Sequence, residues 1–392
     1  MATAAQPFTL HVGTYTDGAS KGIYRLDFDP STGALGEPAL AAQAVNPAFL
    51  AWHPRLPVLY TVSEMDTGPD RQGLVIAYAV AADGSLTALN EQPSGGPAPC
   101  YVSVDRSGAR LFVANYHGGS VAALPIDTNG RLHAPSSIVR HYGSSVHPVR
   151  QRKAYAHSIV PAPAAPAAVA SGASTASSRL AAEAQSSAQG ASSFALAADL
   201  GIDRVVVYHV DDASGVLTLH DGAGAGTAVP GAGPRHLAFA PAGDAVFVIN
   251  ELNSTIASYA WDATRGTLDR RGDPVSTLPD GFTGENTTAE IAVHPTGRFL
   301  YGSNRGHDSI AIFRIASDHR LTRVGLHGTH GKTPRHFALD PTGAFLIAAN
   351  QDSDSLVVFR IDSGTGLLVD TIARARVPSP ACVRFRSHKP IA

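Results

Sequence analysis

Cysteine is almost absent from this chain of 392 residues, which contains only Cys100 and Cys382. Both stand at the start of apolar runs, so we expect two buried free thiols rather than a disulfide. No apolar stretch approaches the roughly 20 residues that a membrane-spanning helix requires. Met1–Pro7 has neither basic residues nor an apolar run, so we expect no secretory signal there. These absences favour a cytoplasmic protein that is not embedded in a membrane.

The chain also lacks a pronounced charge of either sign. It has 30 lysines and arginines against 32 aspartates and glutamates, which gives a net charge of −2 with histidine neutral. This balance provides no overall electrostatic reason to bind nucleic acid or an anionic membrane. Any cationic site must therefore be local. The sequence specifies no oligomeric state.

A unit of about 45–55 residues recurs along the chain, a period typical of four-stranded propeller blades. Each copy has an apolar alternating run, a turn with Pro and Gly, a second β-rich run that ends near Asn, a polar turn and a third β-rich run. The clearest copies begin at Pro234, Glu290 and Pro334, and the looser ones at Asn46, Pro99 and Ala156.

The two ends of the chain complete each other. The N-terminal segment FTLHVGTYTDGASKGIYRLDFD supplies the later strands of a unit, and SPACVRFR from Ser379 supplies its missing first strand. We therefore predict an all-β fold, a seven-bladed β-propeller in which the N- and C-terminal strands pair in one blade. This closure leaves no free sheet edge. We expect residues 1–392 to form a single domain.

One copy is interrupted between its first and second strands by an Ala/Ser-rich insertion at about residues 164–193. This composition cannot build a packed core, so we interpret the insertion as a surface loop.

The repeat places polar side chains at one end of the central channel. The residue that begins the first strand and the residue that ends the second share one end of a blade, because an antiparallel hairpin joins the two strands. In five copies these two positions lie about sixteen residues apart: Ala48 with Glu64, Cys100 with Tyr116, Arg235 with Glu251, Ala289 with Arg305, and Arg335 with Gln351. In the interrupted copy, His157 takes the first-strand position.

These positions predict a ring of side chains that handles a small anionic substrate. Arginines in a concave site bind phosphate or carboxylate with both arms of the guanidinium group. His157 and Glu251 could move a proton near neutral pH. Arg–Glu pairs in a propeller could instead tie neighbouring blades together, and we consider Arg335 with Gln351 the pair best suited to that structural role.

Other residues near the ring are candidate substrate contacts. His236 and Glu290 lie one residue further along the first strand than the ring positions, as does His336. Arg150 and Lys153 precede His157 and could contact a phosphate, or could belong to a solvated basic loop. With Arg335 and Gln351, these residues complete the predicted substrate-binding set.

The chain resembles the propeller lactonase family, which includes bacterial 6-phosphogluconolactonases of the propeller type and fungal 3-carboxy-cis,cis-muconate cyclases. The resemblance covers nearly the whole chain and is strongest in HVGTYT, RQRKAYAHS, GPRHLAF, INELNSTI and SNRGHDSI. It implies a catalytic set of His157, Arg235, Glu251 and Arg305. The Ala/Ser-rich insertion departs from the family pattern.

The resemblance implies a hydrolase that opens a sugar lactone, with 6-phosphogluconolactone of the pentose phosphate pathway as the expected substrate. Water would attack the ester carbonyl, with Arg235 and Arg305 stabilising the oxyanion or holding the phosphate. An arginine beside Glu251 should lower the pKa of that carboxyl, which favours His157 as the base. The alternatives are a muconate-type lactonising enzyme or cycloisomerase, and a scaffold that catalyses nothing.

We predict no cofactor and no required metal ion. Seventeen histidines are present, but those outside the ring, including His327 and His330, have neither HxH nor HExxH spacing.

Overall fold

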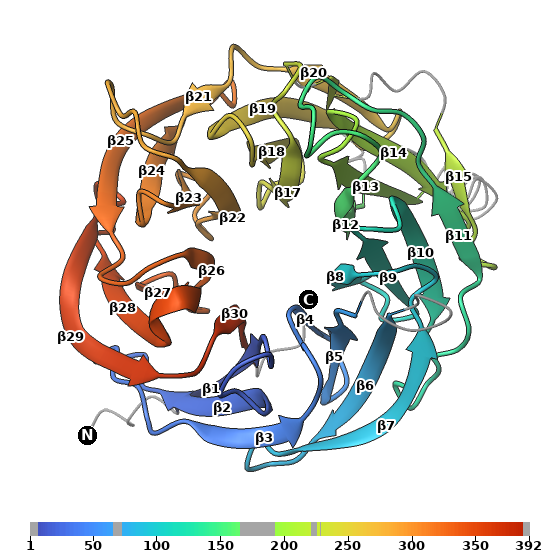
Figure 1. Cartoon of the computed structure of the whole chain (residues 1–392), viewed down its shortest axis with the longest axis horizontal. Helices are drawn as coiled ribbons and strands as arrows, with labels where there is room; N and C mark the ends of the chain where they lie inside the picture. The colour runs from blue at the N-terminus through green and yellow to red at the C-terminus, as the bar shows by residue number, and fades with distance from the viewer. Residues whose placement is uncertain (1–6, 66–72, 165–192, 221–225, 228, 387–392) are drawn as a thin grey trace, which may run out of the picture.

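Seven β-sheets stand in a ring around a central channel (Figure 1). The computed structural model describes residues 7–65, 73–164, 193–220, 226–227 and 229–386. All seven sheets are antiparallel, and the predicted seven-bladed β-propeller is confirmed. Among the described residues the one helical segment is a 3-10 turn at Gln351–Ser353. No helix in the described ranges has the length and hydropathy to cross a membrane.

The blades are numbered here in chain order, and the first strand of each lines the channel. Blade 1 contains β4 (Leu50–Trp52), β5 (Val58–Ser63), β6 (Leu74–Val80) and β7 (Leu86–Pro93). Blade 2 contains β8 (Pro99–Val104), β9 (Arg110–Asn115), β10 (Ser120–Pro125) and β11 (Ser137–Arg140). Blade 3 contains β12 (Ala156–Pro161), β13 (Ser193–Asp199), β14 (Arg204–Val210), β15 (Leu217–Leu219) and β16 (Gly226–Thr227).

The second half of the ring follows the same plan. Blade 4 contains β17 (Pro234–Phe239), β18 (Ala245–Asn250), β19 (Thr255–Asp262), β20 (Thr267–Arg270) and β21 (Val275–Ser276). Blade 5 contains β22 (Thr287–Val293), β23 (Phe299–Arg305), β24 (Ser309–Ile315) and β25 (Leu321–Gly328). Blade 6 contains β26 (Pro334–Leu339), β27 (Phe345–Asn350), β28 (Ser355–Ile361) and β29 (Leu368–Arg376).

Blade 7 closes the ring with strands from both ends of the chain. Its order is β30 (Pro380–Phe385), β1 (Phe8–Thr14), β2 (Gly22–Phe28) and β3 (Ala39–Gln43). β1 pairs with β30 in a register that sets Val12 opposite Val383. The closure predicted from SPACVRFR is therefore confirmed, and β1 is not left as an exposed edge.

The insertion leaves blade 3 at the expected point, between β12 and β13. Residues 165–192 lie outside the described residues. Cys100 and Cys382 are both buried and unpaired, as predicted.

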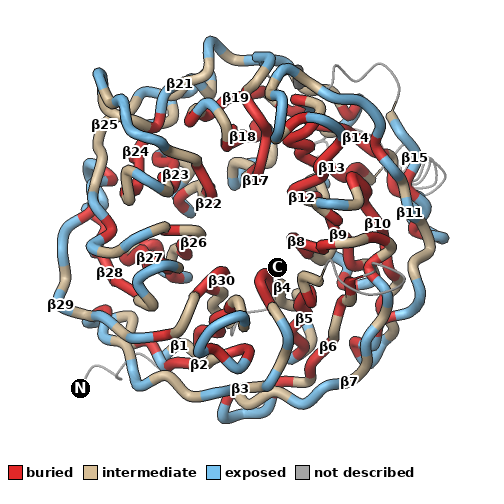
Figure 2. The backbone as a smooth tube through the Cα atoms, in the orientation of Figure 1, coloured by how far each residue is buried: buried red, intermediate tan, exposed pale blue. Residues whose placement is uncertain are grey.

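Apolar side chains pack between neighbouring blades, where Figure 2 shows the buried residues concentrated on the inner and middle strands. Glycines in the turns between third and fourth strands make this packing possible. Gly366 (φ +76°) in blade 6 lies over the ring of Phe299 in blade 5, so close that an added Cβ would meet that ring at 2.5 Å. Tyr301 donates a hydrogen bond to the Gly366 carbonyl at 2.9 Å. Gly33 (φ +79°) makes the same approach to Phe345 one blade further on.

We predict that Gly366→Ala lowers the free energy of unfolding by about 2–4 kcal/mol, because the new methyl group is both in the left-handed region and against a buried ring. Denaturant titration followed by circular dichroism would measure it. Gly364→Ala is the matched control, since its nearest neighbour would be the Asp362 carboxylate at 3.5 Å. Equal stability of the two variants would contradict this account of blade packing.

Candidate active site

A repeated β-bulge creates the ring that the register predicts. In β17, Pro234 is opposite Asn250 but His236 is opposite Ile249, so Arg235 is an extra residue without a partner in the ladder. The same shift occurs in the first strands of blades 2, 3 and 6, and its extra residues are Cys100, His157 and Arg335. A bulge redirects the side chain of its extra residue. The four bulges therefore direct these side chains to one mouth of the channel.

Glu251, which directly follows β18, is the centre of the charged cluster at this mouth. Its Oε2 accepts from Arg235 Nε at 3.0 Å and lies 3.0 Å from Arg305 Nη2. Its Oε1 accepts from Arg150 Nη2 at 2.5 Å. The Glu251 side chain is 4% exposed, and that of Arg235 is 3% exposed. Residues from three different segments thus meet on one buried carboxylate.

The electrostatics of this cluster keep Glu251 ionised. Burial by itself would raise the pKa of Glu251, but Arg305, Arg235 and Arg150 lower it, and the net shift is far below the usual range. Burial lowers the pKa of Arg305 to about 10, and its Nε has no hydrogen-bond partner in the structure. Glu251 therefore serves to orient guanidinium groups and is a poor proton acceptor.

His157 is a buried, neutral imidazole at this mouth. Burial lowers its pKa well below the usual value, and the charge of Arg235 adds to that shift. Its Nε2 lies 3.8 Å from Glu251 Oε2, which is too long for a hydrogen bond. The neutral imidazole thus has a ring nitrogen without a strong partner, 3.8 Å from the carboxylate that holds three arginines.

Arg335 belongs to the same mouth, but its partner differs from the one expected. The structure does not pair Arg335 with Gln351: Arg335 Nη2 donates to Tyr15 Oη at 2.6 Å, and Tyr15 donates to Glu64 at 2.8 Å. Gln351 keeps a buried side-chain oxygen without a hydrogen-bond partner. The expectation of an Arg335–Gln351 tie was wrong because the closing blade provides a competing acceptor in Tyr15, which directly follows β1.

A second layer of titratable groups lies beneath the ring. His236 Nδ1 is 3.1 Å from Glu290 Oε2, and His336 Nε2 is also 3.1 Å from that oxygen. Burial lowers the pKa of both histidines, that of His336 to about 3. The ring of His236 meets that of His157 edge to face, with centroids 5.3 Å apart. This layer supports the ring residues from below.

Of the two upstream residues predicted to contact substrate, Arg150 and Lys153, the structure brings only Arg150 to Glu251. Lys153 is exposed and donates to the His117 carbonyl at 2.6 Å. The mouth also contains Tyr15, Glu64 and Tyr116. Each directly follows the second strand of its blade, the position that Glu251 occupies in blade 4. The register placed Glu64 and Tyr116 in the ring without assigning them a role, and the same register continued into blade 7 could have found Tyr15.

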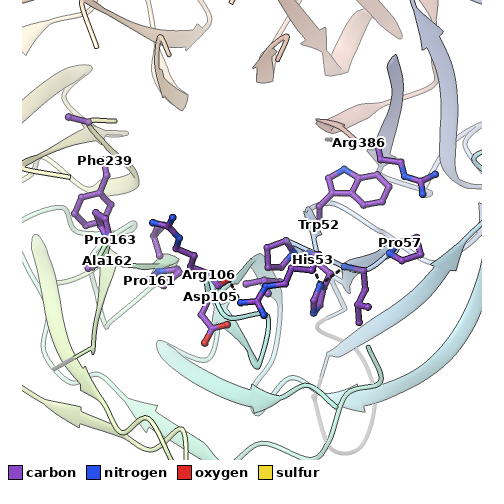
Figure 3. Close-up of a pocket in the computed structure, with 16 residues that line it drawn as sticks. Trp52, His53, Pro57, Asp105, Arg106, Pro161, Ala162, Pro163, Phe239 and Arg386 are labelled. Atoms are coloured by element: carbon purple, nitrogen blue, oxygen red, sulfur yellow. Dashed lines mark hydrogen bonds between the residues drawn. The ribbon is translucent and has the colours of Figure 1, made fainter. Parts of the chain in front are cut away.

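A cavity lies at the opposite mouth, where the first strands end (Figure 3). It has a volume of about 670 Å³, and Trp52, Arg55, Arg106 and Phe239 line it. Its histidine, His53, accepts from two backbone amides through Nδ1, and its Nε2 contacts the Gly108 carbonyl at 3.1 Å. Both imidazole nitrogens of His53 are therefore engaged, so this cavity lacks the available base found at the mouth that contains Glu251 and His157. We call that mouth the ring mouth.

Comparison with known proteins agrees with the fold. The family profile described as "Lactonase, 7-bladed beta-propeller" matches residues 9–173 and 184–385. The chain belongs to this lactonase family. The departure noted in the sequence, the Ala/Ser-rich insertion, contains the gap between the two matched stretches.

Several members of the propeller lactonase family are similar over most of their length. The 6-phosphogluconolactonase of Bacillus subtilis is 37% identical over 377 residues, 96% of this chain and 97% of that protein. The 6-phosphogluconolactonase of Formosa agariphila is 31% identical over 84% of this chain and 85% of its own. The crystal structure of the periplasmic gluconolactonase PpgL of Pseudomonas aeruginosa has a TM-score of 0.84 at 31% identity, and covers 97% of this chain and 99% of that one.

We predict that Glu251→Gln lowers the free energy of unfolding by about 3–5 kcal/mol, because it leaves buried guanidinium groups without their counter-charge. Denaturant titration would measure the loss. Glu91→Gln, at an exposed position on β7, is the control and should change stability little. A fully stable Glu251→Gln protein would show that the carboxylate does not hold the cluster together.

Proposed function

We propose that this protein hydrolyses 6-phosphogluconolactone to 6-phosphogluconate at the ring mouth. Relatives with the name 6-phosphogluconolactonase, similar over 84–96% of the chain, support this activity. The observation that carries the proposal is the convergence of His157 with Arg235 and Arg305 around Glu251. One neutral base thus stands beside guanidinium groups that can hold an anion.

The charge at this mouth favours a phosphorylated lactone over a neutral one. Four guanidinium groups and two carboxylates meet there, which formally leaves two positive charges uncompensated: Arg150, Arg235, Arg305 and Arg335 against Glu64 and Glu251. Guanidinium groups bind phosphate oxygens through paired hydrogen bonds. A phosphate group on the substrate would neutralise this excess, whereas unphosphorylated gluconolactone would leave it buried and unpaired.

The reaction proceeds in two stages on the lactone carbonyl. His157 takes a proton from water through Nε2 as the oxygen attacks, and the carbonyl oxygen gains the negative charge. Arg305, whose Nε has no partner in the structure, is positioned to donate to that oxyanion. The ring C–O bond then breaks, and the proton held by His157 passes to the departing alkoxide. Glu251 positions the arginines and exchanges no proton.

The proposal predicts that substitution of His157 or Arg305 lowers the lactonase activity. His157→Ala and Arg305→Ala should each lower kcat/KM for 6-phosphogluconolactone at least 10²-fold, since each removes a group that acts mainly in the transition state. Hydrolysis would be followed through the acid released, after subtraction of the spontaneous rate. Arg55→Ala, in the cavity at the opposite mouth, is the matched control and should keep wild-type activity.

The same assay separates the competing functions. Wild-type protein would be offered 6-phosphogluconolactone, gluconolactone and 3-carboxy-cis,cis-muconate in parallel. The proposal expects the phosphorylated lactone to be preferred. Turnover of the muconate alone would indicate a lactonising enzyme, and no turnover above the spontaneous rate would indicate a scaffold. Loss of activity in Arg55→Ala with full activity in His157→Ala would move the reaction to the other mouth.

The pH profile provides an independent check on His157. The base must be neutral, and its pKa lies well below the ordinary value of 6.5. The rate is then insensitive to pH between 8 and 6.5 and falls only when the pH drops further and protonates the imidazole. Stopped-flow measurement of kcat/KM at constant ionic strength would test this. A decline centred at or above pH 6.5 would mean that the imidazole is not held in the neutral form.

A further inference from the structure

A second cluster of potential ligands lies on the outer edge of the ring, where blades 5 and 6 meet. His327 is in β25, His330 follows that strand, and Asp370 is in β29, the outermost strand of the next blade. Figure 1 shows these two strands at the rim, away from the channel. One ligand atom from each side chain lies within 4.8 Å of the other two. The three side chains are 24%, 40% and 59% exposed, so an ion could reach them from solvent.

The hydrogen bonds of His327 prepare it as a ligand. Its Nδ1 is 2.9 Å from the Gly328 carbonyl, and because a carbonyl can only accept, Nδ1 must carry the hydrogen. In the neutral ring, the lone pair is then on Nε2, which faces Asp370 Oδ1 at 3.5 Å. Two acceptors that face each other repel unless a proton or a metal ion lies between them. A backbone carbonyl that fixes the tautomer in this way is a regular companion of metal-bound histidine.

The remaining contacts hold both imidazoles toward the same carboxylate. His330 Nε2 is 2.6 Å from Asp370 Oδ1, the oxygen that His327 also faces. Both imidazoles pack on the buried ring of Phe359 in β28, with centroids 5.0 and 5.8 Å away. The side chains are therefore positioned by packing as well as by their polar contacts.

The backbone at His330 adds an independent observation. His330 has φ +54°, in the left-handed region that disfavours residues with a Cβ. The equivalent position of blade 1, two residues after the outer strand β7 ends, is Gly95 with φ +81°. His330 thus occupies a position with a left-handed backbone, which glycine adopts with less strain. Nine other non-glycine residues in the described ranges, His319 among them, also have a positive φ, so this strain accompanies the site and does not by itself identify it.

We propose that His327, His330 and Asp370 bind a divalent first-row transition metal ion, for which Zn²⁺ is the best match. Two imidazole nitrogens and one carboxylate oxygen form a donor set that Zn²⁺ accepts, with water in the fourth tetrahedral position. The ion would join β25 of blade 5 to β29 of blade 6 and would stabilise the folded ring, because it binds the assembled site and not the unfolded chain. This role is separate from lactone hydrolysis.

The test compares Zn²⁺ retention by the full-length protein and its variants. After equilibrium dialysis against buffered Zn²⁺, metal analysis should find one more ion per chain in the wild type than in Asp370→Asn. His330→Gly should lose the same ion although its backbone is relieved of strain, so a folding defect cannot account for the loss. His319→Asn removes a partly buried histidine whose Nε2 is 3.7 Å from a single carboxylate, Asp244, and should retain the wild-type amount.

Thermal unfolding gives a second readout. Zn²⁺ should raise the melting temperature of the wild type and of His319→Asn, and that rise should be absent in His330→Gly and Asp370→Asn. Arg374, whose charge is felt at Asp370, opposes cation binding, so Arg374→Gln should bind Zn²⁺ more tightly. Equal retention of Zn²⁺ by the wild type and Asp370→Asn, or an equal thermal response in His330→Gly, would overturn the proposal and leave a plain His–Asp contact between blades.

Discussion

The charged mouth of this propeller depends on one buried carboxylate. Glu251 contacts guanidinium groups from Arg150, Arg235 and Arg305, while the side chains of Glu251 and Arg235 are almost fully removed from water. Cations brought this close together would repel one another strongly without a counter-charge. The carboxylate therefore allows the fold to collect positive charge in one place. The same arrangement lowers the pKa of Glu251, which removes it as a base and leaves that role to the neutral His157 in the mechanism we propose.

The β-bulges explain why charges from separate blades can meet at all. In a regular strand, successive side chains alternate between the two faces of the sheet, so a residue and its neighbour cannot serve the same site. The extra residue in β17 breaks this alternation at Arg235. Arg235 then reaches the carboxylate at the mouth, and His236, the next residue, contacts Glu290 in the layer beneath. The same bulge in β26 repeats this two-layer arrangement, with Arg335 at the mouth and His336 beside Glu290.

The fold was predictable from the sequence because each blade repeats the same order of β-rich runs and turns, and because the terminal segments together supply one complete blade. The meeting of His157 and Arg235 with Glu251 was predictable for the same reason, since each occupies a fixed position in the repeat. Pairings between blades were not predictable. The register within a blade does not specify which residue of a neighbouring blade accepts a hydrogen bond from Arg335. In the structure that acceptor is Tyr15, in the closing blade. The contact between His330 and Asp370 was unpredictable for the same reason, because Asp370 lies 40 residues after His330 and one blade further on.

The two mouths of the channel show why concavity alone does not identify an active site. They are separated by the length of a first strand such as β17, six residues, or roughly 20 Å at about 3.3 Å per residue. The cavity at the opposite mouth has arginines and a histidine, but every nitrogen of His53 is engaged by backbone groups. The ring mouth instead retains an imidazole nitrogen without a close partner and an arginine with an unpartnered Nε. Unsatisfied groups held in place by their neighbours are what a reacting substrate can use, since the fold has already met the cost of orienting them.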